Sequence, residues 1–460
     1  MTEGLLRDLV AIPAEAHARE VDPRADLALV AVDTEGILGD ARHADDDAAR
    51  RRVVKDLLWE ELGLADQGTS VAVTKLIWRG TGRRVEVVLE NVRDKERLPQ
   101  AEFAPGEAGT VRVVMDYPVD PGFNPSDALN RVRGLRDELN GPATLVWFAH
   151  HLSQPREADL SNLVVVNYVL EQDRLADLTP NLTADDRYYA RAQLETRRDT
   201  LAARLREALT RAYGVNSAED SDLGSAAEEQ VLAFEPGLEP RVLLGQPLRG
   251  ALQRLSFQLL DHLYPGHPDF DPNVRGQELK VTELDTVVRA VEAAARDKAG
   301  RYEVPQADLA TLNKVASPLK LGVMHGDAFV LGQEWPQLIE RKADRAPEAS
   351  VRQLREWIDS EQPGLPGPVR DLVVVCYAIQ ADRAWLRAGQ QINMPGLTML
   401  ADDMVLRDGD NGPVEPSRPD RVFSRRVPAG EVAGVVEEIC DAADANREAE
   451  FEILWRVVIR

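Results

Sequence analysis

Three largely apolar runs stand out in the middle of the chain, and polar segments with helical patterns separate them. They are Val111–Met115, Thr144–Phe148 and Leu163–Val166. Runs with so little alternation are typical of strands buried on both faces, and helical crossovers between them favour a parallel sheet. The pattern therefore predicts a central parallel α/β module over residues 110–180.

The residues before this module predict a helix followed by a β-hairpin. Apolar side chains share one face over residues 45–62, and Gly63 supplies a left-handed stop. Strand patterns at residues 71–78 and 84–92 then flank a glycine-containing loop. Because a helix and a hairpin in this order form the back half of a winged-helix unit, we expect a winged-helix-like N-terminal part within residues 1–98.

Helical periodicity predominates after the module. One long helix is predicted from Asp185 to Tyr213, with a start signal at Thr183 and Asp186 and a stop at Gly214. A short helical pattern occurs near Ala226–Leu232. Further helices are predicted near residues 248–263, 281–299, 306–315, 335–342, 347–360, 369–389 and 431–446. The expected fold class is a multidomain mixture of α/β and α-helical parts, with a helical C-terminal part.

Composition narrows the class of protein. With 460 residues, 44% hydrophobic and 29% charged, the chain fits a soluble protein of two to four domains. A net charge of -23 argues against a protein that coats nucleic acid, although a local basic patch could still bind it. Only Cys376 and Cys440 are present, which excludes a disulfide framework. Without a signal peptide or a membrane-spanning run, we expect a cytoplasmic protein with no membrane contact.

The C-terminus stops inside an apolar pattern, Phe451–Ile459. A strand at the last residues would leave an unpaired edge, which folded domains usually avoid. We therefore expect the chain to be part of a longer protein; the alternative is a C-terminal strand that completes a sheet.

Nucleotide hydrolysis needs a phosphate-binding loop, G-x-x-x-x-G-K-[ST], whose backbone N–H groups and lysine surround the phosphates. The sequence contains no such string, and its nearest approach, Gly80-Thr81-Gly82-Arg83, reads as a hairpin tip. We therefore expect no ATP hydrolysis, no bound cofactor and no catalytic residue in this chain by itself.

Acidic residues near strand ends support an alternative, a metal-dependent hydrolase or nuclease. Asp116 follows a predicted strand, the place where nucleotide hydrolases hold Mg²⁺, and Asp120 lies close behind it. These two aspartates are the candidate metal ligands of that alternative. A second group, His262–Asp271, matches no standard ligand spacing, so we expect it to be a packed loop at a helix exit.

The predicted hairpin loop, Arg79–Arg83, is the basic site of an otherwise acidic chain. Four cationic residues cluster there with Trp78, and they are Lys75, Arg79, Arg83 and Arg84. Such a tip can contact backbone phosphate, so these four residues are the predicted nucleic-acid site, with double-stranded DNA as the ligand. The alternative is a solvated turn or a contact with another domain.

A series of short motifs occurs along the chain in the order of a known family. They are Trp78–Thr81, Val87–Asp94, Val113–Pro118, Asp120–Gly122, Thr144–Trp147, Leu263–Phe270, Pro318–Gly322, Met324–His325 and the helix at Asp371–Trp385. No single motif is chemically diagnostic, and the specificity lies in their order. On these motifs the chain resembles the large ATPase of bacteriophage exclusion (BREX) systems, called PglY-like or BrxC-like.

The resemblance implies a cytoplasmic antiviral component of bacteria that works with a DNA methyltransferase and a phosphatase-like protein. Full-length members of the family use ATP and Mg²⁺, but their P-loop would lie upstream of Met1, so no ATP-contacting residue carries over. Residues 1–98 would be the end of the ATPase module, 110–180 the α/β module, 181–405 a mainly helical region and 421–460 the start of a further domain. The expected function is a non-catalytic scaffold that contacts DNA and is coupled to ATP hydrolysis elsewhere. A purely protein-binding regulator is a third option that the amphipathic helices permit.

Overall fold

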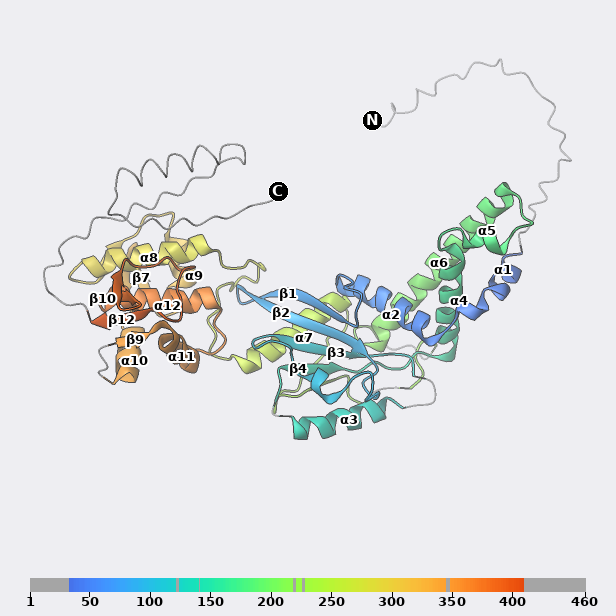
Figure 1. Ribbon diagram of the computed structural model, residues 1–460, viewed down its shortest axis with the longest axis horizontal. Helices are drawn as coiled ribbons and strands as arrows, with labels where there is room; N and C mark the ends of the chain where they lie inside the picture. Colours follow the sequence, from blue (N-terminus) through green and yellow to red (C-terminus); the bar gives the residue numbers. More distant parts are fainter. Residues whose placement is uncertain are drawn as a thin grey trace, which may run out of the picture. The chain divides into compact units, whose positions relative to one another are not determined.

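The described residues belong to one of the chain's two compact units. The computed structural model describes residues 33–120, 124–139, 141–217, 221–225, 228–344 and 348–408 (Figure 1). The predicted domain at residues 421–460, with its helix and its terminal apolar pattern, lies outside the described residues.

A mixed five-stranded sheet forms the centre of the first half, in the order β1-β2-β3-β4-β5 (Figure 1). Its strands are β1 Val71–Trp78, β2 Thr81–Glu90, β3 Val111–Asp116, β4 Thr144–Trp147 and β5 Val231–Ala233. Strands β2, β3 and β4 run parallel, whereas β1 and β5 pair antiparallel at the two edges. The parallel pairing predicted from the first two apolar runs is confirmed.

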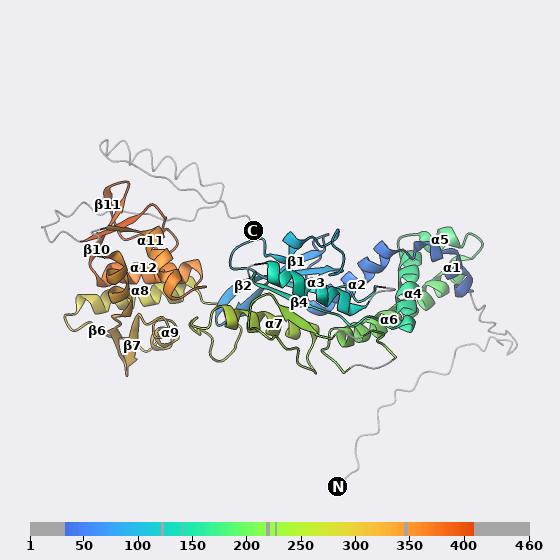
Figure 2. The ribbon, with the colours of Figure 1, turned by 90° about the horizontal axis from the view of Figure 1, so that it is seen from below.

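Both faces of this sheet are covered, which explains why every residue of β3 is buried. Val113 belongs to a core shared with α7 (Leu248–Leu263), and its neighbour Val114 belongs to a core shared with α3 (Pro125–Glu138). Since neighbouring side chains of a strand point to opposite faces, these two helices cover opposite sides of the sheet (Figure 2).

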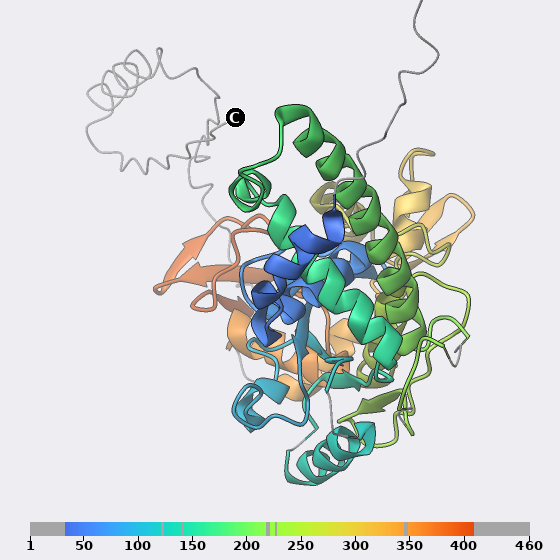
Figure 3. The same cartoon turned by 90° about the vertical axis from the view of Figure 1, so that its right-hand side faces the viewer.

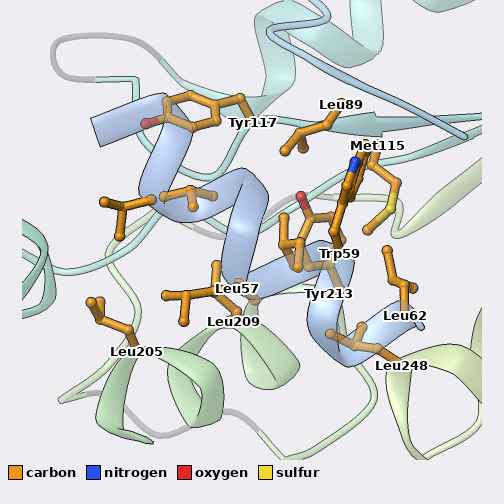
Figure 4. Close-up of a cluster of buried hydrophobic side chains, with 14 of the residues drawn as sticks. Leu57, Trp59, Leu62, Leu89, Met115, Tyr117, Leu205, Leu209, Tyr213 and Leu248 are labelled. Carbon is orange, nitrogen blue, oxygen red and sulfur yellow. The ribbon is translucent and has the colours of Figure 1, made fainter. Parts of the chain in front are cut away.

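Helix α2 (Asp47–Leu62) lies on the same side of the sheet as α7 and packs in the same core. Its Trp59 lies beside Met115 of β3, and its Leu57 lies near Leu209 of a later helix (Figure 4). The helix ends at Gly63, which has a φ of 67° and adopts the left-handed conformation that the sequence predicts there.

The predicted winged-helix-like part is not confirmed. The hairpin β1–β2 is not a separate wing, because β2 pairs with β3 over Val85–Glu90. Residues 99–109, which separate the first two predicted domains, contain only a short 3₁₀ helix at Gln100–Phe103. The residues on either side of them therefore share one sheet.

The sequence pattern predicts a strand for the third apolar run, and this prediction is wrong. Residues Leu163–Val166 lie inside α4 (Gln154–Leu170), where all four side chains are buried. A short apolar run fits a buried helix as well as a buried strand, and here the helix buries more than one face against its neighbours. The short helix predicted near Ala226–Leu232 is also wrong, because residues 231–233 form the strand β5.

A helical group packs beside the sheet and faces the viewer in Figure 3. Besides α4 it contains α1 Thr34–Asp40, a 3₁₀ turn at Arg42–Ala44, α5 Arg174–Leu178 and α6 Ala184–Ala212. The long helix α6 begins at a capping box in which the Thr183 hydroxyl and the Asp186 carboxylate satisfy each other's backbone N–H groups. This start, and the stop at Gly214 with a φ of 72°, confirm the sequence prediction.

The second half has its own core and two small sheets, so it is less helical than predicted for residues 181–405. Its helices are α8 Val281–Arg296, α9 Leu309–Val315, α10 Glu334–Ala343, α11 Val351–Glu361 and α12 Gly367–Gln380. Its strands are β6 Arg301–Glu303, β7 Gly322–His325, β8 Ala328–Leu331, β9 Glu348–Ser350, β10 Arg383–Arg387, β11 Gln390–Ile392 and β12 Val405–Asp408. The helix predicted at 369–389 ends early, because its last residues leave it to form β10.

Candidate functional site

The tip of the β1–β2 hairpin is a two-residue turn. Trp78 pairs with Thr81, which leaves only Arg79 and Gly80 between the strands. Both have positive φ angles, 46° and 74°, the backbone pattern that suits the twist of a tight hairpin. The turn is therefore shorter than the predicted loop, and Arg83 lies within strand β2.

This tip is bound through its backbone by the segment between α7 and α8, which we call the connecting segment (residues 265–280). The carbonyl of Arg79 accepts a hydrogen bond from the Phe270 N–H (3.1 Å), and the carbonyl of Gly80 accepts one from the Leu279 N–H (2.9 Å). A Cβ atom on Gly80 would lie 2.8 Å from the Cβ of Phe270. Only glycine allows so close an approach at this backbone conformation.

Arg83 is the central side chain of the contact, with 7% of its surface exposed. Its Nη2 atom donates to Nε2 of His267 (2.9 Å) and to the carbonyl of Gly364 (2.7 Å). The guanidinium also stacks over Trp78, 5.0 Å from the ring centroid, and near Tyr264. Arg83 thus joins the hairpin to the connecting segment and to the loop before α12.

Burial without a nearby carboxylate sets the electrostatics of this group. Desolvation lowers the pKa of Arg83 to about 10, so the side chain is still a cation at neutral pH. Burial, followed by the adjacent Arg83 charge, lowers the pKa of His267 to about 4. Because Nδ1 of His267 lies 2.7 Å from the Pro268 carbonyl and donates to it, neutral His267 keeps Nε2 free to accept from Arg83.

The other predicted nucleic-acid residues have acidic partners. Arg79 donates to Asp261 of α7 (2.7 Å), and Lys75 pairs with Glu278 of the connecting segment (2.6 Å). Lys75, Arg79 and Arg83 therefore come together in a contact with another part of the chain, the alternative stated for this tip. Arg84 pairs instead with Glu107, at 3.4 Å. Nucleic-acid binding by these four residues stays a prediction.

Sequence reasoning missed the acceptors of this contact. The sequence predicts a packed loop at a helix exit over His262–Asp271, and no local signal connects that loop to the hairpin. Among the residues that the structure describes, no group of three or more His, Cys, Asp or Glu side chains could hold a metal ion. Gly364 had no signal at all, since it contributes only a backbone carbonyl.

The acidic residues of the hydrolase alternative lie at the carboxyl end of β3. Asp116 is buried and accepts a hydrogen bond from the Val92 N–H (2.9 Å), and burial raises its pKa to about 7, with the neighbouring Asp120 charge adding to the effect. Asp120 accepts two hydrogen bonds from Arg93 and one from Asn91, all at 2.9 Å. A buried carboxyl and an ion-paired carboxylate make a poor pair of metal ligands.

Comparisons with known proteins agree with the motif order. The PglY fourth domain matches residues 37–264, and the 5th domain of the BREX System ATPase PglY protein matches residues 282–378. The connecting segment falls between the two matches. No solved structure matches the chain. In the described part of the chain, no helix is long and apolar enough to cross a membrane.

The two matches follow each other in the order of their domain numbers and together span most of the chain. The family resemblance found in the sequence is thereby confirmed: the chain belongs to the PglY family of ATPases of BREX phage-defence systems.

Proposed function

We propose that residues 33–408 are a non-catalytic scaffold of a PglY-family defence protein, in which the hairpin tip couples the fourth domain to the fifth. One observation carries this proposal. Arg83, a residue of the fourth domain, donates both to His267 in the connecting segment and to Gly364 within the fifth-domain match. A change in the position of the hairpin is thus passed directly to the fifth domain.

In this role the chain takes part in phage defence without performing the chemistry itself. ATP and Mg²⁺ would act on another part of the full-length protein, and the scaffold would pass the resulting movement to other BREX components, among them the methyltransferase and the phosphatase-like protein. Buried, directional contacts suit such a relay, because a packed interface has discrete arrangements and deforms little between them.

Two neighbouring arginines test the proposal. Arg83→Ala leaves His267 and Gly364 without their charged donor, and we expect a loss of stability of about 2–3 kcal/mol together with a loss of phage protection in cells. Arg84→Ala removes the same side chain from an exposed position and should preserve both. Plaque counts and thermal unfolding of the purified chain are the two measurements. Full protection by a folded Arg83→Ala variant would contradict the coupling role.

DNA contact by the hairpin tip is tested separately from coupling, with the exposed Lys75 and Arg84. If the tip binds phosphate, the exposed Lys75 and Arg84 should matter more than the buried Arg83, because phosphate must reach them. Duplex DNA binding would then weaken in Arg84→Ala, and the slope of log K against log salt would fall by about 0.9 per lost phosphate contact. Equal binding by the wild type, Lys75→Ala and Arg84→Ala would remove DNA contact from the proposed role.

A further inference from the structure

The connecting segment holds the hairpin tip at two places that differ in strength. At the first, Phe270 is fully buried in the core of the second half while its N–H donates to Arg79. At the second, Leu279 is only partly buried, and the nearby ion pair of Lys75 and Glu278 has 60% and 43% of its side-chain surface exposed. Exposed pairs contribute little to stability, so the second attachment is the weaker one.

Between these two attachments the chain forms an exposed loop with a strained residue. Val274 has a φ of 50° and is 82% exposed. The left-handed region is unfavourable for any residue with a Cβ, and most of all for a β-branched one. Because Val274 is so exposed, packing around its side chain does not compensate for this backbone conformation.

The loop is closed by Asp271. Its carboxylate accepts hydrogen bonds from the N–H groups of Arg275 (3.0 Å) and Gly276 (2.7 Å), and its carbonyl accepts one from Val274 (2.8 Å). These bonds hold Val274 in the left-handed conformation. If the segment straightened, Val274 would return to a favourable φ, so the strain favours detachment, and the burial of Phe270 makes Leu279 the end that detaches.

We propose that residues 271–279 are a releasable strap, which detaches from Gly80 at Leu279 while Phe270 stays anchored. Release frees the carbonyl of Gly80 and the ammonium of Lys75. It also leaves residues 271–279 as an unattached linker between the residues matched by the two family domains. Its use in defence rests on the coupling role proposed above. The strap itself is a property of the purified chain and can be measured without that role.

Two substitutions in the loop should shift the equilibrium between the attached and the released strap in opposite directions. Val274→Asn replaces a β-branched residue by one that tolerates the left-handed region, and should slow hydrogen exchange of the Leu279 amide on the order of 5-fold. Gly276→Ala, at a φ of 67° with no atom within 4 Å of the added Cβ, introduces strain without a clash and should speed that exchange roughly 5- to 30-fold. The Phe270 amide should not respond to either change.

Gly245→Ala is the matched control, since Gly245 has a φ of 78° and equally open surroundings in a different loop. It should leave the Leu279 amide unchanged. Equal shifts of the Leu279 and Phe270 amides would mean that the segment opens as one piece, and no shift in either loop variant would mean that the loop stores no strain; each result overturns the strap. Opposite shifts with unchanged phage protection would support the strap and contradict its use in defence, whereas the coupling role itself is tested by Arg83→Ala.

Discussion

Gly80→Ala is expected to lower the free energy of unfolding by about 3 kcal/mol and to detach the connecting segment from the hairpin. Two costs add. At a φ of 74° an alanine loses about 1–2 kcal/mol relative to glycine, and its Cβ would lie 2.8 Å from the Cβ and 3.0 Å from the carbonyl carbon of Phe270. Neither atom is the end of a flexible side chain, so the backbone itself must move. Denaturant unfolding measures the loss, and hydrogen exchange at Phe270 and Leu279 locates it.

Gly68→Ala separates the two costs. Gly68 has a φ of 75°, nearly the same as that of Gly80, but no atom lies within 4 Å of the position of its Cβ. This variant should lose only the backbone part, about 1–2 kcal/mol, and should leave exchange at Phe270 and Leu279 as in the wild type. Equal losses in the two variants would mean that the tip is not docked against Phe270.

Asp116→Asn is expected to make the chain more stable than the wild type at neutral and alkaline pH. The folded pKa of Asp116, about 7, lies above the ordinary value of 3.8, so folding favours the protonated form. The associated stability is complete below pH 3.8 and is lost as the pH rises toward 7. A shift of this size corresponds to about 4 kcal/mol.

Asparagine does not ionise, and its amide oxygen can still accept from the Val92 N–H. The difference in unfolding free energy between the variant and the wild type should therefore be small near pH 4 and grow to about 4 kcal/mol by pH 8. Asp120→Asn serves as the control, because it weakens the hydrogen bonds from Arg93 and should destabilise the chain at pH 8. A difference independent of pH would contradict a buried, protonated Asp116.

The same position tests the hydrolase alternative. If Asp116 and Asp120 held a metal ion, titration with Mn²⁺ or Mg²⁺ would release heat that disappears in Asp116→Ala. We expect no such heat, because the carboxylate oxygens of Asp120 already accept from Arg93 and Asn91, and Asp116 is shielded from water.

Errors in the sequence prediction occurred where local signals fit two structures. The run Leu163–Val166 fits a buried strand and a buried helix equally well, and burial by α6 and other neighbours decided for the helix. The hairpin was placed correctly at β1, but its assignment to a winged-helix unit was not confirmed. Its partner strand β3 begins only after the 99–109 linker, and a pattern along the chain does not specify which strands pair.

The sequence by itself determined the elements whose signals are local: the capped helix α6, the helix α7, the strand β1 and the stop at Gly63. It also located the cationic residues at the hairpin tip and identified the protein family. Only the tertiary structure decided what the tip contacts, because Arg83 and Gly364 are 281 residues apart and Gly364 contributes a backbone carbonyl that every residue has. Periodicity and helix caps depend on residues that are near one another in the chain. The contact between two domains depends instead on which distant surfaces bury each other.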